Sequence, residues 1–189
     1  MKEKVIQAAL EEIKIHALKF TMQDITRRLH ISKTSLYKVV PSKDQLVHDI
    51  LDYEISSFNR KEKEITGSSL SSSDKIFRFI SLYIDSFHSI NTAVYDELRL
   101  DYEEDWKKWM HFQQEKIDDL LELIDEGTKK REFRPVNLPV LRRCLILSAS
   151  GLADSAFLEE NRLSFSDALS SLQDILFNGI RNTHSCHKA

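Results

Sequence analysis

One short segment of the chain carries a dense set of hydrogen-bond donors. A single apolar residue, Leu36, stands among five polar side chains: Lys33, Thr34, Ser35, Tyr37 and Lys38. Ammonium and hydroxyl groups donate to phosphate oxygens, and short polar side chains reach the edges of bases. If Leu36 faces a core, the five donors are left on the outside of one helix. This pattern fits nucleic-acid recognition and fits equally well a simple solvated helical face, which is what most such faces are.

The residues just before this segment predict a first short helix. Thr21 is a good N-cap, and Asp24 follows at the position that completes a capping box. Ile25 and Leu29 lie one turn apart and are expected to face inward. The helix therefore begins at residue 21 and presents its basic side, Arg27-Arg28, to the outside.

A tight turn and a second helix follow. His30-Ile31 is the expected turn, and Ser32 is the N-cap of the helix that carries the donors. Pro41 disfavours helical geometry at the residue before it and ends that helix. Ser42 is the N-cap of a third helix, for which Gln45 is expected to be the reciprocal capping partner. Two short helices joined by a tight turn are the layout of a helix-turn-helix DNA reader.

Residues 4 to 53 resemble the tetracycline-repressor (TetR) family of transcriptional regulators. The resemblance rests on four segments in this order: Val5-Ile6-Gln7-Ala8-Ala9-Leu10, Phe20-Thr21-Met22-Gln23-Asp24-Ile25, Ile31-Ser32-Lys33-Thr34-Ser35-Leu36-Tyr37 and Pro41-Ser42-Lys43-Asp44-Gln45-Leu46. It implies an all-α protein, with a three-helix head that binds DNA and a helical body that binds a ligand and dimerises. Such proteins are usually repressors that bind a palindromic operator and are released by a small molecule.

The resemblance also assigns DNA contacts to particular residues. Thr21, Tyr37 and Lys43 are expected to bind phosphates, and Lys33-Thr34-Ser35 to enter the groove. The complete predicted set is Thr21, Ser32, Lys33, Thr34, Ser35, Tyr37, Lys38 and Lys43. The chain departs from the family pattern at several positions. Histidine replaces a common glycine at His16, where the family has a left-handed turn, and at His30, and Val39-Val40 replaces an aromatic pair.

Charge and composition agree with a basic head on an acidic body. Residues 1–47 hold nine Lys or Arg and five acids, so they carry a formal charge of +4, whereas the 189-residue chain carries −3. We therefore place a DNA-binding domain at 1–47 and an effector-binding and dimerisation domain at 48–189. Three prolines and four glycines favour long helices. No signal-peptide or membrane-spanning run occurs, so a cytoplasmic protein is expected.

The body is expected to consist of helices throughout. The third head helix should run on toward residue 61, and the polar, Ser-rich segment 66–73 should be a loop. Apolar residues at helical spacing predict the later helices. These are expected over residues 74–90, 92–102 and 103–130, then from a cap at Asn137 through Ser155, and from a cap at Ser164 with Asp167 as its box partner.

Many aromatic residues of the body fall in one stretch of sequence. Aromatic side chains line ligand cavities in helical proteins, although most buried aromatics are simply core. We predict an effector pocket for an unknown small molecule lined by Phe77, Tyr83, Phe87, Tyr95, Trp106, Trp109 and Phe112.

The last two expected helices are candidates for the interface of a homodimer. Cys144, Ser148, Gly151 and Ser155 form a line of small residues that would let another helix approach closely, either in the same subunit or in a second one. The family resemblance favours the second subunit. The predicted interface is Cys144, Ser148, Gly151, Leu152, Ser155, Leu169, Leu172, Ile175 and Leu176.

Two alternative interpretations of the function remain. The first is an enzyme or metal protein, based on the His111/Glu115 pair and on His184, Cys186 and His187 near the end. A single pair on a helix and a short terminal cluster do not make a catalytic or metal site, and no phosphate loop or nucleophile motif is present. We therefore predict neither an enzyme nor a bound cofactor. The second rival is a helical interaction protein of this fold whose head no longer reads DNA.

Overall fold

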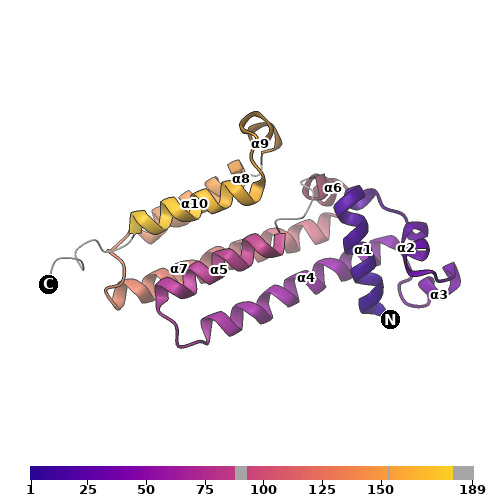
Figure 1. Cartoon of the computed structure of the whole chain (residues 1–189), viewed down its shortest axis with the longest axis horizontal. Coiled ribbons are helices and arrows are strands. Elements are labelled where there is room, and N and C mark those ends of the chain that lie inside the picture. Colours follow the sequence, from indigo (N-terminus) through magenta and orange to yellow (C-terminus); the bar gives the residue numbers. More distant parts are fainter. Residues whose placement is uncertain (88–92, 153, 181–189) are drawn as a thin grey trace. The chain divides into compact units, whose positions relative to one another are not determined.

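The computed structural model describes residues 1–87, 93–152 and 154–180 (Figure 1). These residues form α-helices, one 3-10 helix and no β-strand, which confirms the predicted all-α class. The helices divide between two compact units. Unit 1 comprises residues 1–58 and the described part of 89–112, and unit 2 comprises the described residues of 59–88 and 113–189.

Unit 1 begins with the three-helix head. Its elements are α1 (Lys2–His16), the 3-10 helix η1 (Ala17–Lys19), α2 (Met22–Leu29), α3 (Lys33–Tyr37) and the first part of α4 (Lys43–Thr66). Their apolar faces meet in one core, in which Val5, Ile25, Leu36, Val40 and Leu46 are fully buried. Because Leu36 is one of them, the outward placement expected for its polar neighbours is confirmed.

The caps of the head helices are largely those expected. The Thr21 hydroxyl accepts from the Asp24 N–H at 3.3 Å, and Asp24 accepts from the Thr21 N–H at 2.8 Å, which completes the capping box. The Ser32 hydroxyl accepts from the Ser35 N–H at 3.1 Å. Ser42 caps the Gln45 N–H, but the reciprocal bond predicted for Gln45 is wrong. The Gln45 amide instead donates to Asp49, one turn further along the same helix.

The left-handed turn after α1 lies one residue later than expected. His16 has φ −118°, and the positive φ of 48° falls on Ala17. The turn between α2 and α3 does pass through a left-handed residue, since His30 has φ 52° and ψ 42°. Histidine tolerates that region better than most residues with a Cβ, which explains how it replaces glycine there.

Two further helices complete unit 1. These are α6 (Ala93–Asp101) and the first part of α7 (Glu103–Lys129). His48 of α4 lies 2.7 Å from Asp105 of α7, and Lys108 of α7 pairs with Asp52 of α4. Residues 93–112, which the sequence assigned to the body, therefore pack with the head helices. The predicted domain boundary at residue 47 stays a prediction, because compact packing does not locate the functional division.

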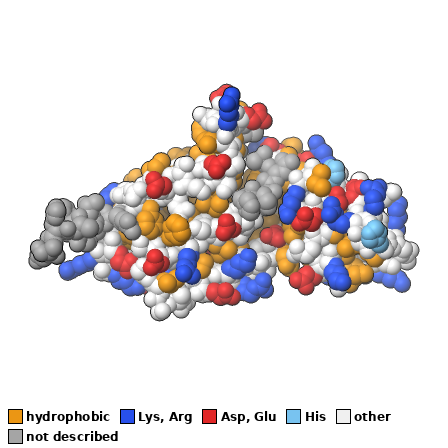
Figure 2. Space-filling view, viewed as in Figure 1, with side chains coloured by type: hydrophobic (Ala, Val, Ile, Leu, Met, Phe, Trp, Pro, Cys, Tyr) orange, Lys and Arg blue, Asp and Glu red, His pale blue; other side chains and the backbone are white. Residues whose placement is uncertain are grey.

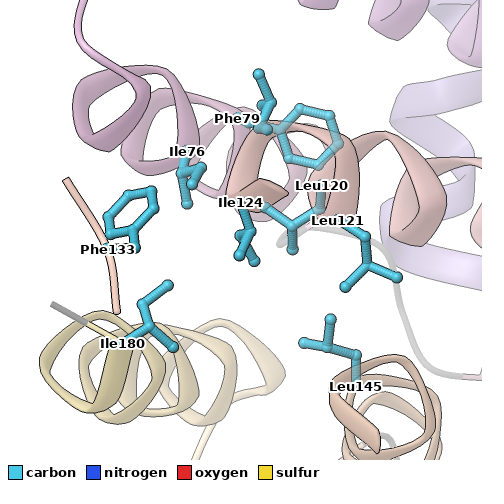
Figure 3. Packing of buried hydrophobic residues seen from close by; sticks show 9 residues of the cluster. Ile76, Phe79, Leu120, Leu121, Ile124, Phe133, Leu145 and Ile180 are labelled. Carbon is cyan, nitrogen blue, oxygen red and sulfur yellow. The ribbon is translucent and has the colours of Figure 1, made fainter. Parts of the chain in front are cut away.

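Unit 2 contains the remainder of α4 and α7 together with α5 (Ser72–Phe87), α8 (Leu138–Leu152), α9 (Ser155–Asn161) and α10 (Phe165–Ile180). Figure 3 shows apolar side chains from α5, α7, α8 and α10 converging on one core. Its buried members are Ile76, Phe79, Leu120, Leu121, Leu123, Ile124, Phe133, Leu145 and Ile180. These residues come from segments far apart in sequence, so long-range packing builds this core.

The segment after α7 joins two helix ends of unit 2. The Glu132 carboxylate accepts from the Ser72 and Ser73 N–H groups at 3.3 and 3.0 Å, which caps α5. Arg134 donates through Nε to the Gly179 carbonyl at 2.7 Å, at the end of α10. A carboxylate at a helix start and a guanidinium at a helix end both complement the helix dipole.

Most predicted body helices are confirmed within a few residues, and one helix was missed. The structure ends α8 at Leu152 and begins a separate helix, α9, capped by the Asp154 side chain on the Phe157 N–H at 2.9 Å. Arg162, at φ 54°, ends α9 in a left-handed cap. The capping box of Ser164 and Asp167 at the start of α10 is confirmed. In the described ranges, every helix is too short or too polar to cross a membrane.

Candidate functional site

The outer surface of α2 and α3 is the candidate nucleic-acid interface. Most of the residues predicted to contact DNA are exposed there, and Tyr37 exposes 47% of its surface. The three residues of the turn, 30–32, set α3 against α2, and the buried Leu36 anchors α3 to the core of the head. Folding thus leaves seven of the predicted residues exposed, namely Thr21, Ser32, Lys33, Thr34, Ser35, Tyr37 and Lys38.

The hydrogen bonds of Thr21 restrict what its side chain can do. The Thr21 hydroxyl donates to Asp24 Oδ2 at 2.7 Å, so its proton is already engaged. These bonds from the Thr21 side chain and backbone hold the pKa of Asp24 below its usual range. The charged Asp24 also pairs with Arg27 at 3.1 Å. In this arrangement a phosphate at the start of α2 would be met by backbone N–H groups rather than by the threonine hydroxyl.

Lys43 is also engaged within the protein. Its ammonium donates to the Leu18 carbonyl and lies 5.1 Å from the centroid of the Phe20 ring. The side chain is half-buried, in contrast to Lys33 and Lys38. Lys43 therefore ties the start of α4 to η1, a role that no local sequence signal indicated. Its predicted phosphate contact stays a prediction.

Basic side chains surround this surface. In the view of Figure 2, blue Lys and Arg atoms gather where Figure 1 labels α1 to α3. Exposed basic residues near the candidate interface include Lys4 of α1, Arg27 and Arg28 of α2, and Lys33 and Lys38. Arg28 is partly neutralised, because it pairs with the buried Glu12 at 2.6 Å. A positive surface of this kind attracts the phosphate backbone without regard to sequence.

The aromatic residues predicted to line an effector pocket come from both units. In unit 1, the ring of Trp109 lies 5.5 Å from both Tyr95 and Phe112, and Trp106 is half-buried on the same helix as Trp109. In unit 2, Tyr83 and Phe87 lie 5.0 Å apart.

Phe77 is more than half exposed and packs edge-on against Phe177 of α10. A crevice in the apolar core of unit 2 has a volume of only about 10 Å³, roughly that of one water molecule. The predicted pocket therefore stays a prediction.

Unit 2 also holds polar groups in its interior. Lys116 of α7 pairs with Glu62 of α4, and both side chains are more than 90% buried. Asp119 also binds Lys116, at 2.6 Å. Burial raises the pKa of Glu62, and Lys116 opposes that rise. Tyr83, whose pKa burial raises to about 12, accepts from the Gln113 amide at 3.4 Å. Composition alone did not indicate the Glu62–Lys116 pair, because the two residues lie 54 positions apart in the sequence.

Most of the predicted dimer residues lie on α8 and α10, which run beside each other in unit 2 (Figure 1), whereas Ser155 is the first residue of α9. Exposed residues on α8 follow one another at three- and four-residue steps, namely Val140, Cys144, Leu147 and Gly151. A Cβ added to Gly151 would meet no atom within 4 Å apart from its own helix backbone and chain neighbours, and Ile175 of α10 exposes 67% of its surface.

Ser148, Leu152, Leu169, Leu172 and Leu176 are half-buried. The side chain of Ser155 lies outside the described part of the structure.

The structure describes only some of the residues on which the alternative hypothesis of an enzyme or metal protein was based. His184, Cys186 and His187 lie outside the described residues. His111 is exposed on α7. Within the described ranges, no three His, Cys, Asp or Glu side chains converge as metal ligands would.

Comparison with known proteins identifies the fold. No family model matches the chain. A curated relative, the uncharacterised HTH-type transcriptional regulator YvaF of Bacillus subtilis, is 25% identical over 181 residues, which cover 95% of each chain.

A TetR-family transcriptional regulator from Agrobacterium tumefaciens superposes with a TM-score of 0.74 at 14% identity, covering 96% of this chain and 97% of that one. A regulator from Saccharomonospora viridis in complex with choline gives 0.78 at 15% identity, with the same coverage. The chain therefore has the fold of the TetR regulators, which confirms the fold that the resemblance implied.

Proposed function

We propose that this protein is a TetR-family transcriptional regulator that binds an operator in double-stranded DNA as a homodimer. The observation that carries this proposal is the helix-turn-helix of α2 and α3, whose donor-rich surface surrounds the buried Leu36. Its likeness over 95% of the chain to a curated HTH-type regulator supports the same function. Among the described residues, no competing metal cluster accompanies it.

The head would bind DNA by two kinds of contact. Lys33, Thr34 and Ser35, at the start of α3, would enter the major groove and read base edges. Tyr37 and Lys38 would bind phosphates on either side and set the register. The backbone N–H groups at the start of α2 would take a further phosphate, because the Thr21 hydroxyl is bonded to Asp24.

A homodimer would bind a palindromic DNA site. Two-fold symmetry would place the two copies of α3 about 34–36 Å apart, which is one turn of DNA. The proposed interface is the stripe of Val140, Cys144, Leu147 and Gly151 on α8, together with Ile175 of α10. Large exposed apolar side chains beside small ones suit a helix of a second subunit that approaches closely.

The substitution Gly151→Glu tests the interface. The added side chain has open space in the monomer, so it should leave the fold intact and place a charge in the proposed contact. We expect a dimer for the wild-type chain and a monomer for the variant by analytical ultracentrifugation. Gln114→Glu, at an exposed position of α7, is the matched control and should remain dimeric. An unchanged dimer in Gly151→Glu would move the interface elsewhere.

The proposed regulation is release of DNA by a small molecule. A ligand can shift the protein away from its DNA-binding form only by binding another form more tightly. The choline complex of the structural neighbour shows that a protein of this fold can hold a small ligand. The buried Glu62–Lys116 pair and the aromatic groups are the features of this chain that suit such a role.

Selection of genomic DNA fragments by the purified full-length protein tests the central proposal. We expect enrichment of a palindromic sequence, with an affinity that falls as salt rises because phosphate contacts release counterions. Tyr37→Phe should weaken binding to every duplex, whereas Thr34→Ala should change the preferred sequence by about 1 kcal/mol at one position. If no fragment is enriched even at low ionic strength, the chain is instead a helical interaction protein.

A further inference from the structure

Charged side chains from two different helices hold both backbone polar groups of Leu18. The Leu18 N–H donates to Glu97 Oε2 of α6 at 2.6 Å, and the Leu18 carbonyl accepts from the Lys43 ammonium of α4. Leu18 itself is 95% buried, and the Glu97 side chain exposes only 13% of its surface. Hydrogen bonds of this kind, in which one partner is ionised, are roughly twice as strong as neutral ones.

The residue before Leu18 is held in an unfavourable conformation. Ala17 has φ 48° and ψ −139°, a region that residues with a Cβ rarely occupy. Such a conformation persists only where the surrounding contacts over-determine it. The bonds from Glu97 and Lys43 to the next residue supply contacts of that kind, and we refer to these two side chains as the Leu18 clamp.

The clamp lies directly before the proposed DNA-binding surface. Leu18 is in η1, and Thr21, three residues later, caps α2. The direction in which the chain enters α2 therefore depends on the η1 turn. A small change at η1 would shift the N-terminus of α2, and α3 moves with α2 because the two are joined by a short turn.

The helix that supplies Glu97 also carries one of the aromatic residues predicted to meet the effector. Tyr95 lies two residues before Glu97 on α6, and its ring contacts Trp109 of α7 at 5.5 Å. Any rearrangement of α6 around Tyr95 would move the Glu97 carboxylate as well. Its withdrawal would leave the buried Leu18 N–H without an acceptor and Ala17 without support.

We propose that Glu97 is a positioning residue: through its bond to Leu18 it holds the η1 turn in the DNA-binding geometry, so that α6 controls operator affinity. This inference rests on the proposed function, since it concerns the regulation of the same DNA-binding surface. The additional pair of Glu97 with Lys19, at 3.6 Å and with Lys19 83% exposed, contributes little. The hydrogen bond to the Leu18 N–H carries the effect.

The first test compares Glu97→Ala with Asp96→Ala in the full-length protein, using an operator duplex selected by the wild-type chain. Asp96 precedes Glu97 on α6, its side chain is 72% exposed, and it pairs with Arg99 three residues away. Replacing it with alanine therefore makes the same change in charge as Glu97→Ala. We expect Glu97→Ala to lower operator affinity about tenfold relative to Asp96→Ala. Glu97→Gln, which keeps an acceptor oxygen and the side-chain shape, should show an intermediate loss, and it carries the test if Glu97→Ala does not fold.

The second test distinguishes positioning from general destabilisation. Glycine adopts the conformation of Ala17 without strain, so Ala17→Gly should make the turn less dependent on the clamp. In that background Glu97→Ala should cost less than about threefold in operator affinity, whereas a purely structural role would leave the loss unchanged. Hydrogen exchange of the Leu18 amide in the free protein should accelerate in Glu97→Ala and not in Asp96→Ala.

The outcomes separate failure of this inference from failure of the proposed function. A wild-type protein that binds no duplex overturns the proposed function, and with it the control of operator affinity. A wild-type protein that binds its operator, together with a Glu97→Ala variant that matches Asp96→Ala in affinity and in Leu18 exchange, overturns the clamp.

Discussion

The head and unit 2 are both bundles of helices, but different interactions define them. In the head, Thr21 and Ser32 cap the helices with bonds to residues three positions away. In unit 2, the core joins Ile76 of α5 to Leu145 of α8 and Ile180 of α10, residues that are widely separated along the chain. The helix boundaries of the head can therefore be predicted from local sequence, whereas the core of unit 2 depends on which helices pack together.

Charged groups also differ between the two regions. On the head surface, Lys33 and Lys38 remain in water, Lys43 binds a backbone carbonyl, and Arg28, itself exposed, pairs with the buried Glu12. In unit 2, Glu62 and Lys116 are buried together. Exposed charges suit a changing partner such as DNA, whereas a buried pair contributes only when its partner stays in place. This comparison leads to tests in which the same kind of change has different results in the two regions.

The largest effect is expected for the apolar core of unit 2. Phe133 is 99% buried and packs against Gly127, where an added Cβ would lie 2.2 Å from the ring. Phe133→Ala should lower the free energy of unfolding by about 3–5 kcal/mol, measured by urea denaturation at a fixed protein concentration. Phe77→Ala makes the same chemical change at a site that is 55% exposed and should cost less than half as much. Equal losses would contradict the assignment of this core.

Breaking the buried ion pair should have a somewhat smaller effect. Lys116→Met leaves the Glu62 carboxylate buried without its cation, which should cost about 3 kcal/mol at neutral pH. Because Lys116 opposes the burial that raises the pKa of Glu62, its loss should raise that pKa further. The destabilisation should therefore shrink as the pH falls and Glu62 takes up a proton. A loss that is independent of pH in urea denaturation would show that the pair is not buried.

The titration of Glu62 gives a finer test of the same site. Burial holds the pKa of Glu62 in the folded protein above its ordinary range, so the stability linked to its protonation is present at low pH and is lost as pH rises through the folded value. Glu62→Gln cannot titrate. Its free energy of unfolding relative to wild type should therefore increase between pH 4 and pH 7, by an amount that denaturation at several pH values would measure. Glu64→Gln, at an exposed position of the same helix, is the matched control.

The smallest effect on stability is expected for loss of a helix cap, and its effect on DNA binding should differ between the two regions. The same kind of capping box occurs at Thr21 with Asp24 in the head and at Ser164 with Asp167 in unit 2. Thr21→Ala and Ser164→Ala should each lower the free energy of unfolding by about 1 kcal/mol. Only Thr21→Ala should also weaken operator binding, because α2 belongs to the DNA-binding surface. Equal weakening of binding by both variants would show that the loss comes from stability alone.

The sequence predicted well those helix caps in which the hydrogen-bonded residues lie close together along the chain. The boxes at Thr21 and Ser164 and the cap at Ser32 follow from side chains that reach backbone groups three residues away. Prediction failed where two local options competed. Gln45 could bond back to the residue that caps its helix or forward to Asp49, and it bonds forward. The break that starts α9 was missed because the apolar pattern continues across it.

The order of residues along the chain was enough to establish the helical class, the helix-turn-helix and the outward position of its donors, because helix periodicity and capping depend on neighbours within a turn or two. The assignment of Lys43 and Glu97 to Leu18, 25 and 79 residues away, required the folded chain. The same holds for the burial of Glu62 with Lys116. Partners at such separations are chosen by how helices pack, and helix packing depends on all the side chains at the contact together rather than on any local pattern.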